Sequence, residues 1–123
     1  MLRPDLLVFP DYDGNGMFKS LGNIRVNPHV GLLFISMEDK PRRLRVNGTA
    51  EVVLDDPILA GFEGGQALVR VTPADIFPNC PRNIARMQVV EPSPHVPRCG
   101  VERVEPAWKT YEMFADVVPP RKA

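Results

Sequence analysis

The sequence lacks net charge and long apolar runs, and each shortage excludes a class of protein. The 15 Lys and Arg residues balance 15 Asp and Glu residues in a chain of 123 residues. This balance excludes a nucleic-acid binder that works through bulk positive charge. No run approaches the roughly 18 apolar residues of a membrane-spanning helix, so we expect no membrane partner. A chain without net charge has little repulsion between copies, which favours self-association.

Cysteine is scarce, and the familiar signatures of catalytic and metal sites are missing. The beginning of the chain is too short and too polar for a signal peptide. We therefore expect a cytoplasmic protein in which Cys80 and Cys99 are free thiols rather than a disulfide. His29 and His95 are isolated and no Cys/His spacing matches a zinc motif, so no metal site is expected. No nucleophile elbow, P-loop or dinucleotide fingerprint is present, and the catalytic residues stay unidentified.

The richest stretch runs from Phe9 to Ser36, FPDYDGNGMFKSLGNIRVNPHVGLLFIS. Around it we expect a strand at 6–9, a turn at 10–16, a helix at 17–26 and a strand at 30–35. The turn and the helix start gather backbone donors, Lys19 and small polar side chains, a combination typical of a phosphate site. The alternative is a turn closed by Asx bonds, with Lys19 solvated.

The remaining elements indicate a small barrel. Arg43 to Leu54 alternates apolar and polar residues, which predicts a half-buried antiparallel strand with a bulge or bend at Gly48. We expect a helix at 57–62, a strand at 67–72 with an extension at 74–77 after an interruption at Pro73, a short helix at 81–87 and a helical turn at 108–114. The chain has 14 prolines, most of which follow Thr72, and they predict an extended C-terminal arm. The pattern favours a mainly β or α+β fold, but four strands are too few to close a barrel.

Three motifs in this order resemble those of the pyridoxamine 5′-phosphate oxidase-like family of FMN-binding split barrels. They are the stretch from Phe9 to Ser36, RRLRVNGTAEV and IFPNCPRNIARM, and the resemblance covers about residues 6–87. The chain is more similar to the uncharacterised branch, because Phe18, Lys19 and Ser20 stand where the vitamin B6 enzyme has Ser-Arg-Lys. The resemblance implies a six-stranded, Greek-key-like antiparallel split β-barrel with short helices. It also implies a homodimer with FMN at the subunit interface.

The resemblance also indicates what this sequence lacks. In the family, two strands precede the one at Leu6 and carry part of the phosphate-binding set, including a basic residue. We therefore expect a split-barrel domain at 1–88 that is incomplete at its N-terminus, followed by a Pro-rich extension at 89–123.

The resemblance further implies a flavin site built from three clusters. In the first, Lys19 and Ser20 would contact the FMN phosphate. Asp11 and Asn15 would bond the ribityl chain or the polar flavin edge, with Asn23 as a further candidate.

The second cluster opens the basic strand, where Arg43 or Leu44 would contact the isoalloxazine ring. Arg45 shares the strand face of Arg43, and a cation there would stabilise the reduced flavin. The alternative is a solvated strand face. In the third cluster Arg82 would reach phosphate or substrate from the second subunit. Cys80 is expected to be a small buried thiol rather than a reactive one.

These expectations combine into an FMN-dependent oxidoreductase that acts on an unidentified small molecule. The main alternative is a split-barrel binding or interaction module that has lost the flavin. A third reading is a barrel that binds the deazaflavin F420 or haem.

Overall fold

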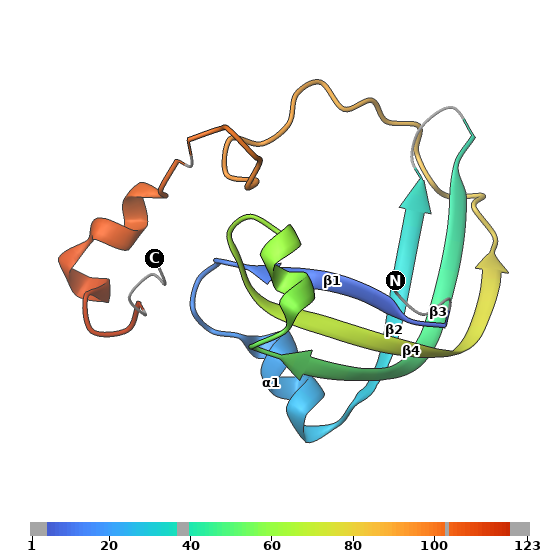
Figure 1. Cartoon of the computed structure of the whole chain (residues 1–123). Helices are drawn as coiled ribbons and strands as arrows, with labels where there is room; N and C mark the ends of the chain where they lie inside the picture. The colour runs from blue at the N-terminus through green and yellow to red at the C-terminus, as the bar shows by residue number, and fades with distance from the viewer. Residues whose placement is uncertain (1–4, 37–39, 103, 119–123) are drawn as a thin grey trace.

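The computed structural model describes residues 5–36, 40–102 and 104–118, and its centre is a four-stranded antiparallel sheet (Figure 1). The strands are β1 (Leu7–Tyr12), β2 (His29–Ser36), β3 (Arg42–Val53) and β4 (Gly65–Asn79). The helix α1 spans Lys19–Val26, and the 3-10 helices are η1 (Pro57–Gly61), η2 (Ala107–Thr110) and η3 (Glu112–Phe114). The strand order is β1-β4-β3-β2, so β1 and β2 are the edges. This half-barrel confirms the expected fold class.

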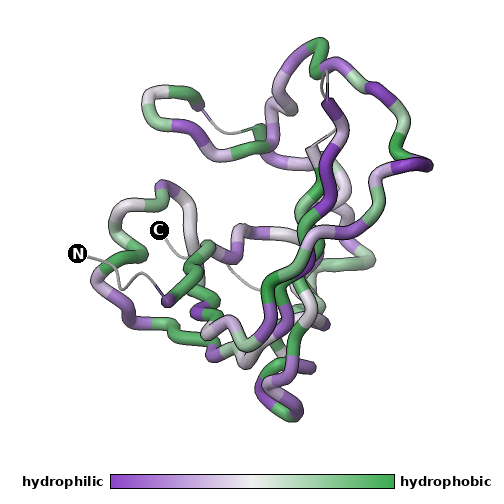
Figure 2. The backbone as a smooth tube through the Cα atoms, turned by 90° about the vertical axis from the view of Figure 1, so that its right-hand side faces the viewer, coloured by the Kyte–Doolittle hydropathy of each residue, from purple (hydrophilic) through white to green (hydrophobic). Residues whose placement is uncertain are grey.

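One cluster of the core lies on the face of the sheet beneath α1. Ala50, Val69 and Val71 are at most 7% exposed, and Leu21 and Ile24 of α1 pack against them. Figure 2 shows both hydrophobic and hydrophilic stretches along the chain, and the sequence of β3 alternates between the two kinds of residue. Because successive side chains of a strand point to opposite faces, this alternation turns apolar side chains of β3, Ala50 among them, toward the face on which the helix packs.

Strand β4 continues through Pro73, where the sequence had predicted an interruption. In the pairing that the structure describes, β1 reaches β4 only as far as Val71, so among the described residues the half of β4 that holds Pro73 has β3 alone as its partner. Proline is tolerated in such edge segments because its missing N–H need not enter a ladder. The strand therefore runs on to Asn79.

The predicted bulge lies at the level of Gly48, but its extra residue is on β4. Asn47 pairs with Asp75 and Gly48 pairs with Pro73, which leaves Ala74 as the additional residue. A Cβ atom on Gly48 would lie 2.2 Å from the carbonyl oxygen of Thr72. Glycine is thus required where the two backbones approach, and the long strands curve strongly from this region (Figure 1).

Two other expected boundaries shift for local reasons. β1 continues past Pro10 to Tyr12, since it is an edge strand that accommodates proline. α1 begins at Lys19 rather than at Met17, because Phe18 adopts the left-handed conformation with φ 47°.

The helix predicted at 81–87 is wrong. The segment makes a single turn in which the N–H of Ile84 donates to the carbonyl of Pro81 at 2.9 Å. One such bond does not offset the cost of nucleating a helix without a buried face to pack.

A buried carboxylate fastens the connection between β3 and β4. Asp56 is 6% exposed, and its Oδ1 accepts from the N–H of Ile58 at 2.9 Å. Its Oδ2 lies 2.5 Å from Nη2 of Arg70 on β4. These contacts cap η1 and tie it to the sheet.

After β4 the chain arcs over the sheet and returns, so that η2 and η3 lie on the side of the turn that follows β1 (Figure 1). The expected helical turn at 108–114 is thus present as these two short 3-10 helices. Within the described ranges, no helix has the length and apolar character needed to cross a membrane.

Candidate functional site

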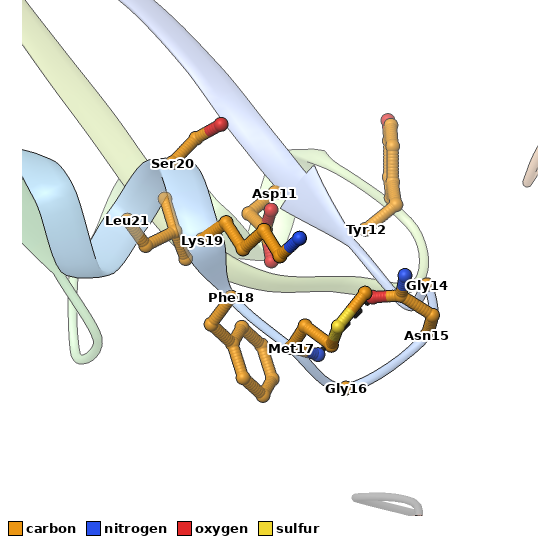
Figure 3. A pocket seen from close by; sticks show the side chains of 10 residues that line it. All are labelled: Asp11, Tyr12, Gly14, Asn15, Gly16, Met17, Phe18, Lys19, Ser20 and Leu21. Atoms are coloured by element: carbon orange, nitrogen blue, oxygen red, sulfur yellow. Dashed lines mark hydrogen bonds between the residues drawn. The ribbon is translucent and has the colours of Figure 1, made fainter.

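The turn after β1 and the start of α1 form an open pocket of about 260 Å³ (Figure 3). We call it the α1 pocket; it is lined by Asp11, Tyr12 and residues 14–21. Four of the predicted site residues meet here, namely Asp11, Asn15, Lys19 and Ser20. Asn23, which the sequence added to this group, is exposed on α1 and does not line the pocket.

The helix start offers free hydrogen-bond donors to this pocket. The N-cap residue Phe18 makes no side-chain capping bond, and no acidic residue occupies the first turn of α1. The first N–H groups of a helix have no partner within the helix and carry the positive end of its dipole. Lys19 adds a formal charge, so this side of the pocket suits an anion.

The turn itself is held by an Asx bond. Oδ1 of Asn15 accepts from the N–H of Met17 at 3.1 Å. The alternative interpretation of Asn15, as a residue that closes the turn, therefore describes its role in this structure. Phe18 follows in the left-handed region, which is unusual for a bulky residue and costs about 1–2 kcal/mol.

Asp11 brings a partly buried carboxyl into the same pocket. Its Oδ2 is buried and has no hydrogen-bond partner in the part of the chain that the structure describes. Burial raises the pKa of this carboxyl above its ordinary value, and the charge of Asp13 raises it further. In Figure 3 the amine of Lys19 extends to the side of the pocket where Asp11 lies. When protonated, Asp11 would donate a hydrogen bond to an anion rather than repel it.

A residue that the sequence did not single out contacts the far side of the turn. Nζ of Lys109, on η2, forms an ion pair with Oδ2 of Asp13. A second pocket of about 280 Å³ lies between this turn and the returning chain; it is lined by Asp13, Gly14, Asn15, His95, Val104, Pro106, Trp108 and Lys109. No local pattern could have paired two residues that are 96 positions apart.

The second predicted cluster lies where β3 begins. Nη1 of Arg43 donates to Oδ1 of Asn79 on β4 at 3.3 Å, while its buried Nε has no partner among the described residues. Arg45 is exposed on the same strand face, whereas Leu44 points to the opposite one.

The third cluster follows directly, where the chain leaves β4. Arg82 is exposed in the turn after β4. Cys80 is also exposed, so the expectation of a buried thiol is wrong. Its position just past the last residue of β4 explains this, since the sheet no longer covers it.

Within one chain, the α1 pocket lies apart from the second predicted cluster. We call this cluster, made of Arg43, Leu44 and Arg45, the Arg43 cluster. Val52 lines a groove beside α1 together with Phe18 and Leu21. Val52 and Arg43 are nine positions apart on β3, which corresponds to a path of about 30 Å along the strand. Within the described ranges, no three His, Cys, Asp or Glu side chains come close enough to hold a metal ion.

Comparison with known proteins finds a family model that matches most of the chain. The family model described as pyridoxamine 5′-phosphate oxidase matches residues 3–90, which is more than half of the chain. The matched region contains the α1 pocket and the Arg43 cluster but ends before Lys109. No curated protein sequence matches the chain.

Proposed function

Because the chain belongs to the pyridoxamine 5′-phosphate oxidase family, we propose that it binds FMN as a homodimer and oxidises or reduces a small molecule. The observation that carries this proposal is the α1 pocket, where Lys19, Ser20 and the uncapped helix start lie together. These groups suit the phosphate of FMN.

The residues of the α1 pocket fit the phosphate end of the cofactor. Lys19 would provide the charge, the first-turn N–H groups would donate to phosphate oxygens, and the hydroxyl of Ser20 would add a further donor. Asp11 is the one acidic group among the described residues that line the pocket, and its raised pKa lowers the cost of holding it neutral beside an anion.

Contacts to the isoalloxazine ring of FMN would come from a second copy of the chain. The α1 pocket lies beside the end of β3 that holds Val52, and Arg43 lies at the other end, a path of about 30 Å along the strand that exceeds the length of FMN. Arg43, Arg45 and Arg82 would therefore meet the flavin from the partner. The face around Arg45 supports this arrangement, because Leu33 and Phe77, its direct neighbours on β2 and β4, are 47% and 38% exposed.

When bound, FMN supplies the hydride or electron transfer, and the protein supplies position and charge. Lys19 and Ser20 would fix the phosphate, and Arg43 and Arg45 would bring positive charge to the ring. The Arg43–Asn79 hydrogen bond would hold this guanidinium against the end of β4.

Titration of FMN with the purified protein, followed by quenching of flavin fluorescence, tests the proposal. We expect the Lys19→Ala variant to bind FMN about ten- to a hundredfold more weakly, because a charge-assisted hydrogen bond is lost. Riboflavin, which has no phosphate, should bind both proteins equally. Arg25→Ala, on the last turn of the same helix, is the matched control. Absence of quenching with the wild-type protein would refute the proposal.

One observation favours a second candidate function, a flavin-free interaction module. Both edge strands, β1 and β2, are unpaired along one side in the described chain, and open edges can recruit another chain. A stable dimer that takes up no FMN would support this candidate.

A further inference from the structure

The C-terminal segment, which we define as Ala107–Phe114, returns to the turn that forms the α1 pocket. Lys109 of this segment pairs with Asp13, and their side chains are only 13% and 21% exposed. The segment lies outside the residues that match the family model. The contact is therefore a feature of this chain that the family match does not describe.

Contacts within the C-terminal segment hold its conformation, which gives the side chain of Lys109 a defined direction. The rings of Trp108 and Phe114 meet edge to face, with their centroids 5.8 Å apart and an interplanar angle of 88°. Oγ1 of Thr110 donates to the carbonyl of Ala107 at 2.8 Å. Nζ of Lys109 also lies 5.8 Å from the centroid of the Trp108 ring, within the range of a cation–π contact.

The ion pair acts on a turn that two pockets share. Gly14 and Asn15 line the α1 pocket on one side and the pocket beneath the C-terminal segment on the other. Asp13 directly precedes them, so its pairing with Lys109 ties the turn to the segment. The charge of Asp13 also acts on the α1 pocket, since it is one of the two causes that raise the pKa of Asp11. The same charge would oppose a bound phosphate.

We propose that Lys109 is a positioning residue of the α1 pocket: it holds the turn at Asp13–Gly16 and offsets the charge of Asp13, so that the pocket accepts the phosphate of its ligand. The first part of the proposal, that Lys109 holds the turn, is the holding role, and it rests on the ion pair alone. The charge role rests on the proposed function, namely binding of FMN through its phosphate.

Hydrogen–deuterium exchange of the protein without added ligand tests the holding role. We expect the amides of residues 14–18 to exchange about fivefold faster in Lys109→Ala than in the wild type, because a partly buried ion pair is lost. Lys109→Arg should restore slow exchange. Lys40→Ala removes the same charge from an exposed site and serves as the control. Unchanged exchange in Lys109→Ala would overturn the holding role.

Binding constants for FMN and riboflavin test the charge role. Lys109→Ala should weaken FMN binding about fivefold and leave riboflavin binding unchanged. Adding Asp13→Asn to Lys109→Ala should restore FMN binding, since the charge that Lys109 offsets is then gone. A double variant as weak as Lys109→Ala would overturn the charge role. If the wild type binds no FMN, the proposed function and the charge role fail together, and the exchange experiment still decides the holding role.

Discussion

Two carboxylates two residues apart have different surroundings, and the difference shapes the candidate site. Asp13 faces the C-terminal segment and pairs with Lys109. Asp11 faces the α1 pocket with a buried Oδ2 that has no hydrogen-bond partner among the described residues. A charged Asp11 therefore costs stability and opposes an anion, whereas a neutral Asp11 does neither.

The raised pKa of Asp11 predicts a pH-dependent effect of Asp11→Asn. A carboxyl whose pKa is higher in the folded chain stabilises the fold while both states are protonated, and this contribution is lost as pH rises through the folded pKa. Asp11→Asn should therefore be more stable than the wild type at pH 7. The gain should shrink as the pH falls toward the unfolded pKa of Asp, about 3.9.

Urea unfolding at neutral and acidic pH measures this difference. Asp75→Asn, at an exposed position on β4, is the control for removing one negative charge. A variant that is less stable than the wild type at pH 7 would contradict the prediction.

The sequence alone could predict that the polar residues of the α1 pocket lie together. It could not predict the contact that Lys109 makes with Asp13. Asp11, Asn15, Lys19 and Ser20 are neighbours along the chain, so the turn and the helix start necessarily bring them together. Lys109 reaches Asp13 only because the chain arcs back over the sheet. That path depends on tertiary packing and leaves no periodic signal.

Among the elements, the paired strands β3 and β4 give the half-barrel its curvature. The bend arises where Gly48 meets Pro73 and Ala74 is the extra residue. The sequence predicted a bend at Gly48 because glycine interrupted a regular alternation. It did not predict a continuous β4. Pro73 is tolerated in the strand because, among the described residues, the pairing of β4 with β1 stops at Val71, and this limit is set by the sheet and not by the local sequence.

Substitution of Gly48 should damage the sheet at this bend. Gly48→Ala would bring a Cβ atom to 2.2 Å from the carbonyl oxygen of Thr72, so the backbone must shift. We expect a loss of about 1–3 kcal/mol in the free energy of unfolding, measured with urea.

Gly31→Ala on β2 is the matched control, because its Cβ would lie 3.5 Å from Oδ1 of Asn47, an ordinary contact. Equal stability of the two variants would show that the approach of β3 and β4 at Gly48 is not tight.

At the scale of the whole molecule, the described chain is half of a barrel with its candidate residues at two separate ends. The α1 pocket suits a phosphate, and the Arg43 cluster lies at the other end of β3, a path of about 30 Å along the strand from Val52. Exposed apolar side chains, among them Leu33 and Phe77, surround that cluster. The motifs in the sequence identified the family and the fold. They did not indicate that the two groups of residues lie near opposite ends of β3, because the position of α1 beside Val52 depends on tertiary packing.

Native mass spectrometry of the wild-type protein with added FMN tests most directly whether two copies share the flavin. We predict a species with two chains and two FMN molecules, and removal of FMN should lower the proportion of dimer because the cofactor bridges the chains. A single chain that retains FMN, or a dimer that takes up none at saturating concentration, would contradict the shared flavin site.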